Sequence, residues 1–297
     1  MTGDRLRIGV ATTTGILALL VSVFCLQAQD PTTSLLGADR ATSQLSSDSG
    51  FSKAVLAALH PTGVLLWPGA PVIAGAADVS RFFGSLANQD SLRLTWQPLG
   101  IDLARDSSFG VTWGVAVATA RLTTGTPQVG RYISAWRREP GRWTIAALLV
   151  VGITPTRAAA SPSGFPLTRE AARARDEIAP FIAADLAFAR LAADSGAAIA
   201  FRRWAARDAV KFGGGGLLIR GPEAIAQTVS GPGRWQWHPV LAGAARSADL
   251  GWTVGEAVIT GKNAQPAYSK YLTIWSRLRG GPVRFLIDGG NSRPPAP

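Results

Sequence analysis

Two acidic residues in the second half of the 297-residue chain stand where a carboxylate could transfer a proton. Glu256 alternates with apolar residues in a segment whose pattern predicts a strand. Asp288 follows the apolar run 283–287. A carboxylate beside an apolar pocket has a raised pKa and can act as a base. The alternatives are a surface charge for Glu256 and a turn cap at 288–291 for Asp288.

Aromatic residues near these acids are spaced to lie on one face of a strand. Tyr271 and Trp275 are four residues apart, which places both side chains on the same side. With Trp237 they predict an apolar pocket in which the Tyr271 hydroxyl donates a hydrogen bond to a ligand carbonyl. Core packing is the alternative use of such large rings. The counterparts in the first half are Trp96, Tyr132 and Trp136.

Residues that bind metals and cofactors are scarce. The chain has two histidines, His60 and His238, and a single cysteine, Cys25, so we expect no metal site. The glycine run 213–216 lacks the Lys-Ser/Thr pair of a phosphate-binding loop and predicts a turn. The sequence contains no Gly-x-Ser-x-Gly elbow. We therefore expect neither a metal nor a cofactor.

Most of the chain is an internal repeat. Three blocks recur in the same order: 48–50 at 194–196, 96–98 at 237–239, and 132–136 at 271–275. We predict a first domain at 38–153 and a second domain at 180–291. A linker rich in proline and alanine is predicted between them, at 154–179.

Each copy begins with helical periodicity and ends with alternating segments rich in β-branched residues. In the second copy the helical pattern runs from Ile182 to Phe201, with a break at Gly196. Strands are predicted at 110–121, 131–137 and 143–151, and again at 251–262, 270–277 and 283–287. Helices followed by antiparallel strands predict the α+β class.

With these residues in view, each copy resembles the SnoaL-like, ketosteroid isomerase-like branch of the nuclear transport factor 2-like superfamily. The motifs that carry the resemblance in the second copy are 206–210, 219–221, 237–239, 249–255, 271–275 and 288–290. The first copy lacks three of the acids, with Thr62, Ser108 and Leu148 at or near their places. This loss indicates a scaffold half or a different ligand.

The resemblance implies a fold and an arrangement of the two copies. Each copy would be a curved antiparallel sheet wrapped around N-terminal helices, forming a cone with one pocket. The two sheets would pair as an intramolecular pseudo-dimer. Related proteins include isomerases, dehydratases, cyclases and domains that only bind, so the fold does not assign a function.

The N-terminal residues predict export. Arg5 and Arg7 precede an apolar stretch at 8–26, and a small residue, Ala28, precedes a polar segment, which is typical of a signal peptide at 1–28. The protein would then be periplasmic or secreted. The alternatives are an uncleaved anchor in the inner membrane through 8–26, and lipidation at Cys25.

The chain carries a net charge of +11, from 30 Lys and Arg against 19 Asp and Glu. The cations are scattered singly or in pairs, as on an ordinary solvated surface. An anionic envelope surface is the alternative partner for this charge, and we expect no nucleic acid partner.

These observations predict an exported protein that binds a small apolar ligand or serves as a scaffold. The alternative is an isomerase or hydro-lyase that acts on a small apolar carbonyl compound in the second domain. In that enzyme Glu256 or Asp288 would be the base, and Tyr271 would donate a hydrogen bond.

Overall fold

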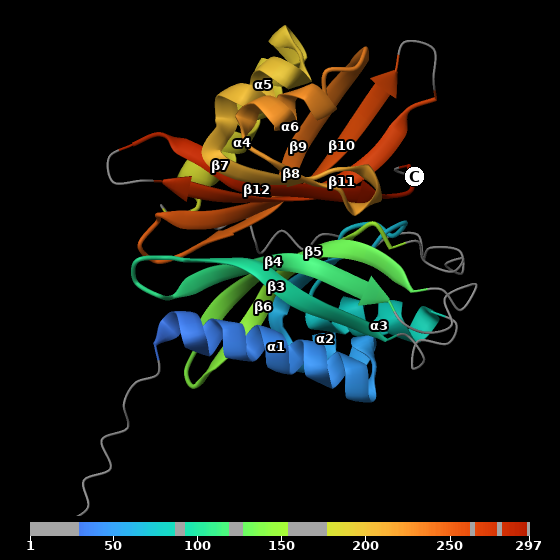
Figure 1. Cartoon of the computed structure of the whole chain (residues 1–297), viewed down its shortest axis with the longest axis vertical. Helices are drawn as coiled ribbons and strands as arrows, with labels where there is room; N and C mark the ends of the chain where they lie inside the picture. Colours follow the sequence, from blue (N-terminus) through green and yellow to red (C-terminus); the bar gives the residue numbers. More distant parts are fainter. Residues whose placement is uncertain are drawn as a thin grey trace, which may run out of the picture.

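The computed structural model describes residues 30–86, 93–118, 127–153, 177–261, 265–277 and 281–295. The predicted signal peptide at 1–28 and most of the predicted linker lie outside these ranges. The described part of the chain forms two repeats, one on each side of the linker, with the same order of helices and strands (Figure 1).

The first repeat is a sheet of six strands with three helices. Its helices are α1 (Pro31–Ser49), α2 (Phe51–Ala58) and α3 (Ala76–Ser85). Its strands are β1 (Leu59–Leu66), β2 (Ile73–Ala74), β3 (Leu94–Leu103), β4 (Phe109–Ala118), β5 (Gln128–Glu139) and β6 (Arg142–Val151). The order of strands across the sheet is β2-β1-β6-β5-β4-β3.

The second repeat has the same topology. Its helices are α4 (Ala179–Ser195), α5 (Ala197–Trp204) and α6 (Pro222–Thr228), with a short 3-10 turn η3 (Gly214–Gly216). Its strands are β7 (Ala205–Phe212), β8 (Leu218–Arg220), β9 (Gly233–Ala244), β10 (Leu250–Gly261), β11 (Ala267–Arg277) and β12 (Val283–Ser292). The strand order is β8-β7-β12-β11-β10-β9.

The predicted α+β class is confirmed, with one difference in the sheets. β1 pairs with β6 in parallel, and β7 pairs with β12 in parallel, so each sheet is mixed rather than wholly antiparallel. In each repeat the last four strands form an antiparallel meander, and its final strand lies alongside the first strand of the repeat in the same direction.

A glycine separates the first two helices of each repeat. Gly50 has φ of 102° and Gly196 has φ of 92°, a backbone conformation that side chains with a Cβ rarely adopt. Each glycine ends one helix and begins the next. The break predicted at Gly196 therefore lies between α4 and α5.

The two sheets face each other, and the helices lie on the outer sides (Figure 1). One buried apolar cluster draws on both sheets and includes Val111, Ile133 and Leu149 of the first repeat and Val254, Leu272 and Ile274 of the second. Each sheet is thus covered by helices on one face and by the other repeat on the opposite face. This explains why β4 and β10 are buried along most of their length rather than at alternate residues.

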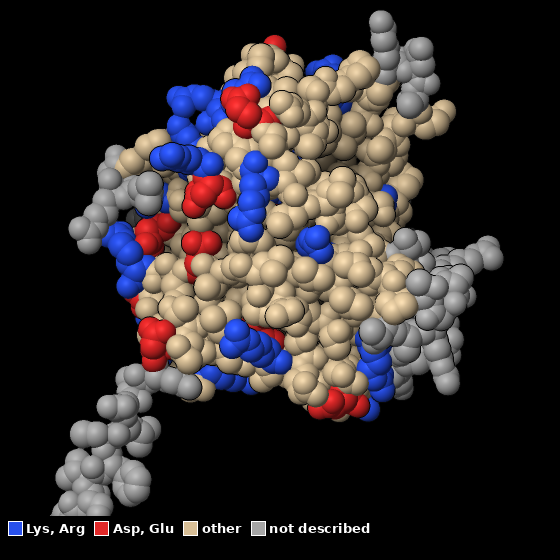
Figure 2. Space-filling model, viewed as in Figure 1, with Lys and Arg blue, Asp and Glu red and all other residues tan. Residues whose placement is uncertain are grey.

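The surface shows no segregation of charge on the face drawn in Figure 2, where Lys and Arg lie among Asp and Glu. Docking on an anionic surface stays a prediction. Within the described ranges, the helices are all too short or too polar to cross a membrane.

Candidate ligand cavity in the second repeat

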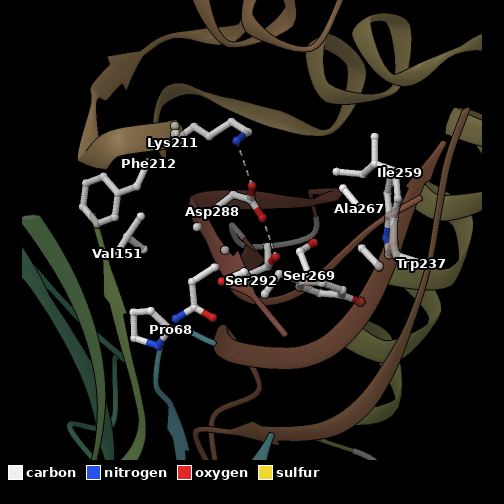
Figure 3. Close-up of a pocket in the computed structure, with 18 of the residues that line it drawn as sticks. Pro68, Val151, Lys211, Phe212, Trp237, Ile259, Ala267, Ser269, Asp288 and Ser292 are labelled. Carbon is white, nitrogen blue, oxygen red and sulfur yellow. Dashed lines mark hydrogen bonds and ion pairs between the residues drawn. The ribbon is translucent and has the colours of Figure 1, made fainter. Parts of the chain in front are cut away.

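A cavity of about 450 Å³ lies inside the second repeat, between its helices and its sheet (Figure 3). This volume falls in the range of small-molecule sites. Four of its aromatic residues come from α4, α5 and β9: Phe188, Phe201, Trp235 and Trp237. The others come from β7 and β11: Phe212, Tyr268 and Tyr271. Pro68 and residues 151–153 of the first repeat close one side. The cavity therefore belongs to the second repeat but borders on both.

Two charged side chains face this cavity, Lys211 at the end of β7 and Asp288 on β12. The two residues are partners in the parallel register, which brings the Lys211 Nζ within 3.9 Å of the Asp288 Oδ2. The Thr273 hydroxyl donates a hydrogen bond of 2.8 Å to the Asp288 Oδ1. Both charged residues are buried, with exposed fractions of 8% and 7%. Burial raises the pKa of Asp288, against the opposing effects of Lys211 and Thr273.

Glycine at the end of β7 leaves the space open. Gly213 follows β7 directly, and the chain then turns through Gly215 and Gly216, whose φ values of 67° and 77° suit glycine. The turn predicted for this run is where the structure has η3. In the first repeat the residue that follows β1 is Trp67, which is buried with its ring 5.3 Å from that of Phe51.

The first repeat has apolar side chains at the positions of the charged pair. Leu65 and Leu148 are register partners in the parallel pair of β1 and β6, at the positions of the Lys211–Asp288 pair. Ser134 pairs with Leu148 in register, and its buried hydroxyl has no hydrogen-bond partner within the described residues. The acid predicted to be missing from the first copy is thus replaced by a leucine in the core.

A second buried carboxylate lies beneath the cavity and holds helix α4 on the sheet. Asp185 accepts hydrogen bonds of 2.9 Å from the Trp237 indole and from the Tyr271 hydroxyl. The Thr253 hydroxyl also bonds to it, and Trp275 donates to Thr253 at 2.8 Å. Burial raises the pKa of Asp185 to about 6, despite these hydrogen bonds, which lower it.

The first repeat contains the same network. Asp39 accepts from the Trp96 indole at 3.1 Å, from the Thr112 hydroxyl at 3.1 Å and from the Tyr132 hydroxyl at 2.7 Å. Trp136 donates to Thr112 at 2.8 Å. Because the network is present around the filled cone as well as the open one, its role is to join the first helix to the sheet.

The predicted residues of the second repeat divide into two groups. Asp288, Tyr271 and Trp237 line the cavity, whereas Trp275 is buried in the core behind it. The Tyr271 hydroxyl already donates a hydrogen bond to Asp185. The turn cap considered for Asp288 is absent, because β12 continues past it to Ser292.

Glu256 does not reach the cavity. Its neighbour Ala257 lines the cavity together with Ile259, and successive side chains of a strand point to opposite faces. Glu256 therefore lies on the other face of β10, where its Oε2 pairs with the Arg293 Nη2 at 3.2 Å. The alternating pattern predicted the strand, but it did not predict which of its residues face the cavity.

The predicted pocket residues of the first repeat, Trp96, Tyr132 and Trp136, all lie in its buried core. Sequence reasoning missed the two network acids, Asp39 and Asp185, and the Lys211 side chain. Asp39 and Asp185 had a signal, because each follows an alanine at the same place in its copy. In the parts of the chain that the structure describes, no group of metal-binding side chains occurs.

No protein-family model and no curated protein sequence matches the chain. A ketosteroid isomerase-like protein from Erwinia carotovora atroseptica SCRI1043 is 19% identical, over 40% of this chain and 95% of its own, with a TM-score of 0.33. An NTF2-like protein of unknown function from Pseudomonas putida KT2440 is 15% identical, over 38% of this chain and 84% of its own, with a TM-score of 0.33.

A putative polyketide cyclase from Xanthomonas campestris pv. campestris is 16% identical, over 41% of this chain and 91% of its own, with a TM-score of 0.32. Each of these matches covers about two fifths of the chain. The chain is similar to ketosteroid isomerase-like and NTF2-like proteins of solved structure.

Proposed function

We propose that the second repeat binds a small, largely apolar molecule, and that the first repeat is its scaffold. The observation that carries this proposal is the cavity of about 450 Å³ in the second cone, where the first cone has Trp67 in its buried core. Aromatic walls with a few polar groups are typical of small-molecule sites.

Contacts between the repeats support the scaffold role. The Asn291 side chain, on the rim of the cavity, donates hydrogen bonds of 2.8 Å to the Leu66 and Val150 carbonyls of the first repeat. The Gly69 amide donates to the Ser292 carbonyl at 2.9 Å. The first repeat thereby holds the end of β12, which carries Asp288, against the cavity.

The test is to close the cavity with the residue that the first repeat uses. Gly213 has φ of −82°, which any residue adopts, and a Cβ there would meet the end of the flexible Ile219 side chain at 3.0 Å. We therefore expect Gly213→Trp to place an indole at the position that Trp67 has in the other cone. We expect calorimetric titration with 2-methoxynaphthalene, an uncharged aromatic probe, to show binding to the parent protein. We expect a loss of about tenfold or more in affinity in Gly213→Trp.

A matched control adds the same indole outside the cavity. Leu217 is 66% exposed and is not part of the cavity wall, so Leu217→Trp should bind the probe as the parent does. Equal affinity of Gly213→Trp and the parent would refute the proposed site.

A second candidate is proton transfer on a small apolar carbonyl compound, as an isomerase or hydro-lyase. The observation that favours it is Asp288, a buried carboxylate of raised pKa that faces the cavity. Asp288 would accept a proton from the carbon beside the carbonyl, and the Lys211 ammonium would donate a hydrogen bond to the carbonyl oxygen. Tyr271 is not used because its hydroxyl is bonded to Asp185.

This candidate predicts solvent exchange of an acidic carbon-bound proton. The parent protein should accelerate deuterium incorporation into 2-tetralone, followed by NMR, and Asp288→Asn should lower that rate by about a hundredfold. Circular dichroism of Asp288→Asn checks that it is folded. An unchanged rate in the folded variant would exclude Asp288 as the base.

We also propose that residues 1–28 direct export and are removed. The support is the order of basic, apolar and small residues. Intact-mass measurement of the protein from the exported fraction should give a chain that begins at Gln29. A mass that includes Met1 would contradict cleavage.

A further inference from the structure

The Lys211–Asp288 pair has hydrogen-bonding capacity that the protein does not use. The distance of 3.9 Å between Nζ and Oδ2 is an ion pair but exceeds a hydrogen bond. The Asp288 Oδ1 accepts from Thr273, whereas Oδ2 accepts no hydrogen bond within the described residues. The Lys211 Nζ lies 5.6 Å from the centre of the Phe201 ring and donates no hydrogen bond in the same part of the chain.

Both groups present this capacity to the cavity. Figure 3 shows the Lys211 side chain extending from its strand toward the Asp288 carboxylate, with Trp237 standing across the cavity. Among the described residues that line the cavity, these two are the charged ones. A ligand that fills the cavity covers both groups, and covering a donor or acceptor without giving it a partner costs free energy, so a ligand that satisfies both groups gains affinity.

We propose that the ligand is a neutral alcohol or phenol whose hydroxyl lies between the Lys211 Nζ and the Asp288 Oδ2. The hydroxyl oxygen accepts from the ammonium, and its proton is donated to the carboxylate. This inference rests on the proposed function, because it names the class of molecule that the same cavity binds.

Other head groups satisfy one member of the pair and oppose the other. A ketone or ether oxygen accepts from Lys211 but has no proton for Asp288. A carboxylate is repelled by Asp288, and an amine cation is repelled by Lys211. A hydroxyl is both a donor and an acceptor and carries no charge, so it matches a pair whose own charges cancel.

The body of the ligand is set by the walls. Phe188 and Trp237 have ring centroids 4.7 Å apart, and Phe201 lies 6.1 Å from Trp237, so the three rings form a continuous aromatic wall that begins at Phe201, beside Lys211. Aromatic rings pack favourably on such a surface. The ligand class is therefore a hydroxyl on an apolar or aromatic body.

A variant that removes the pair without disturbing the fold is provided by the first repeat. Leu65 and Leu148 occupy the equivalent register positions in a sheet of the same topology. The double variant Lys211→Leu/Asp288→Leu therefore replaces the ion pair with two residues that this fold already accommodates. It removes the polar recognition while leaving the aromatic wall in place.

The experiment compares three probes that share one ring system: 2-naphthol, 2-methoxynaphthalene and 2-naphthoate. Their affinities for the full chain are measured by calorimetry at about neutral pH. We expect the parent to bind 2-naphthol about tenfold or more tightly than either other probe, since hydrogen bonds to charged groups are strong. In the double variant we expect this preference to vanish while binding of 2-methoxynaphthalene persists.

The outcomes separate this inference from the proposed function. Equal affinities of the parent for all three probes, or tightest binding of 2-naphthoate, would overturn the hydroxyl assignment and leave the apolar cavity standing. A preference for 2-naphthol that survives in the double variant would also overturn it. Failure of all three probes to bind the parent would overturn the proposed function, and this inference with it.

Discussion

The chain leaves β1 through Trp67 in the first repeat, whereas it leaves β7 through Gly213 in the second. Trp67 is buried inside the first cone, and Gly213 lines the cavity of the second. Where the first cone has two facing leucines, the second has Lys211 and Asp288. One cone is therefore a packed core, and the other is a cavity with a charged pair.

The two repeats nevertheless share the carboxylate network of Asp39 and Asp185. A feature common to the packed cone and the open one serves the fold that they share. A feature found only in the open cone is not required by the fold that the repeats share. The Lys211–Asp288 pair is such a feature, and burying charges is costly unless they are paired. The framework residues are thus those that both repeats share, and the candidate site residues are those found in the second repeat alone.

The largest expected effect comes from breaking the charged pair on one side. Lys211→Leu leaves the Asp288 carboxylate buried without its cation, and Asp288→Leu leaves the Lys211 ammonium buried without its anion. We expect each single variant to lower the free energy of unfolding by about 3–5 kcal/mol. Urea unfolding at about neutral pH measures this change.

The double variant sharpens the same comparison. Lys211→Leu/Asp288→Leu reproduces the residues of the first repeat, and replacing a buried ion pair by apolar residues is often neutral or stabilising. We expect its unfolding free energy to lie within about 1 kcal/mol of the parent or above it. A double variant as unstable as the single variants would show that the two cones are not interchangeable at this position.

A smaller effect is expected from the shared network, and it should be the same in both repeats. Asp39→Ala and Asp185→Ala each leave buried tryptophan, threonine and tyrosine donors unpaired. We expect each to lower the free energy of unfolding by about 2–3 kcal/mol. Urea unfolding of the two variants side by side is the measurement.

The control for this prediction lies on the same helix. Asp194 is exposed at the end of α4, so Asp194→Ala should change the unfolding free energy by about 0.5 kcal/mol or less. A large effect at Asp185 with none at Asp39 would contradict a common framework role and would assign Asp185 to the cavity alone.

The smallest expected effect is a dependence of stability on pH. The pKa of Asp185 is about 6 in the folded protein, above its ordinary value of 3.8, so the folded state binds the proton more tightly. Its ionisation therefore opposes folding by about 3 kcal/mol above pH 6, and this penalty disappears as the pH falls below the unfolded pKa.

Between about pH 7.5 and pH 5, Asp185 should thus raise the unfolding free energy by about 1–2 kcal/mol. Asp185→Asn removes this titration, so the difference between parent and variant isolates it from Asp39 and Asp288, whose pKa values are also raised. A difference between parent and Asp185→Asn that is the same at both pH values would show that Asp185 does not titrate in this range.

Much of the architecture was predictable because the chain carries its elements twice. Alternation predicted the longer strands, and Gly196 indicated the break between two helices. The parallel pairing of β7 with β12 was not predictable, because register between distant strands leaves no local signal. The apolar run before Asp288 was compatible with two uses of this residue, a carboxylate beside an apolar pocket or a turn cap at 288–291, and the local sequence did not decide between them.

Other parts of the site could not be predicted from the pattern. Glu256 and Ala257 are adjacent on β10, and only the position of the other repeat decides which of them faces the cavity. Lys211 has no local feature that distinguishes it from a surface lysine, because its partner Asp288 lies far along the chain.

The sequence by itself determined the duplication, the α+β class, and the kinds of residue available: many large rings, few acids and scarcely any metal ligands. These properties depend on composition and on short-range periodicity, which a linear chain displays directly. Tertiary structure decided which repeat contains the cavity and which face of each strand points into it. It also decided that Lys211 pairs with Asp288. Those outcomes depend on contacts between residues distant in sequence, and such contacts exist only once the two sheets have folded and packed together.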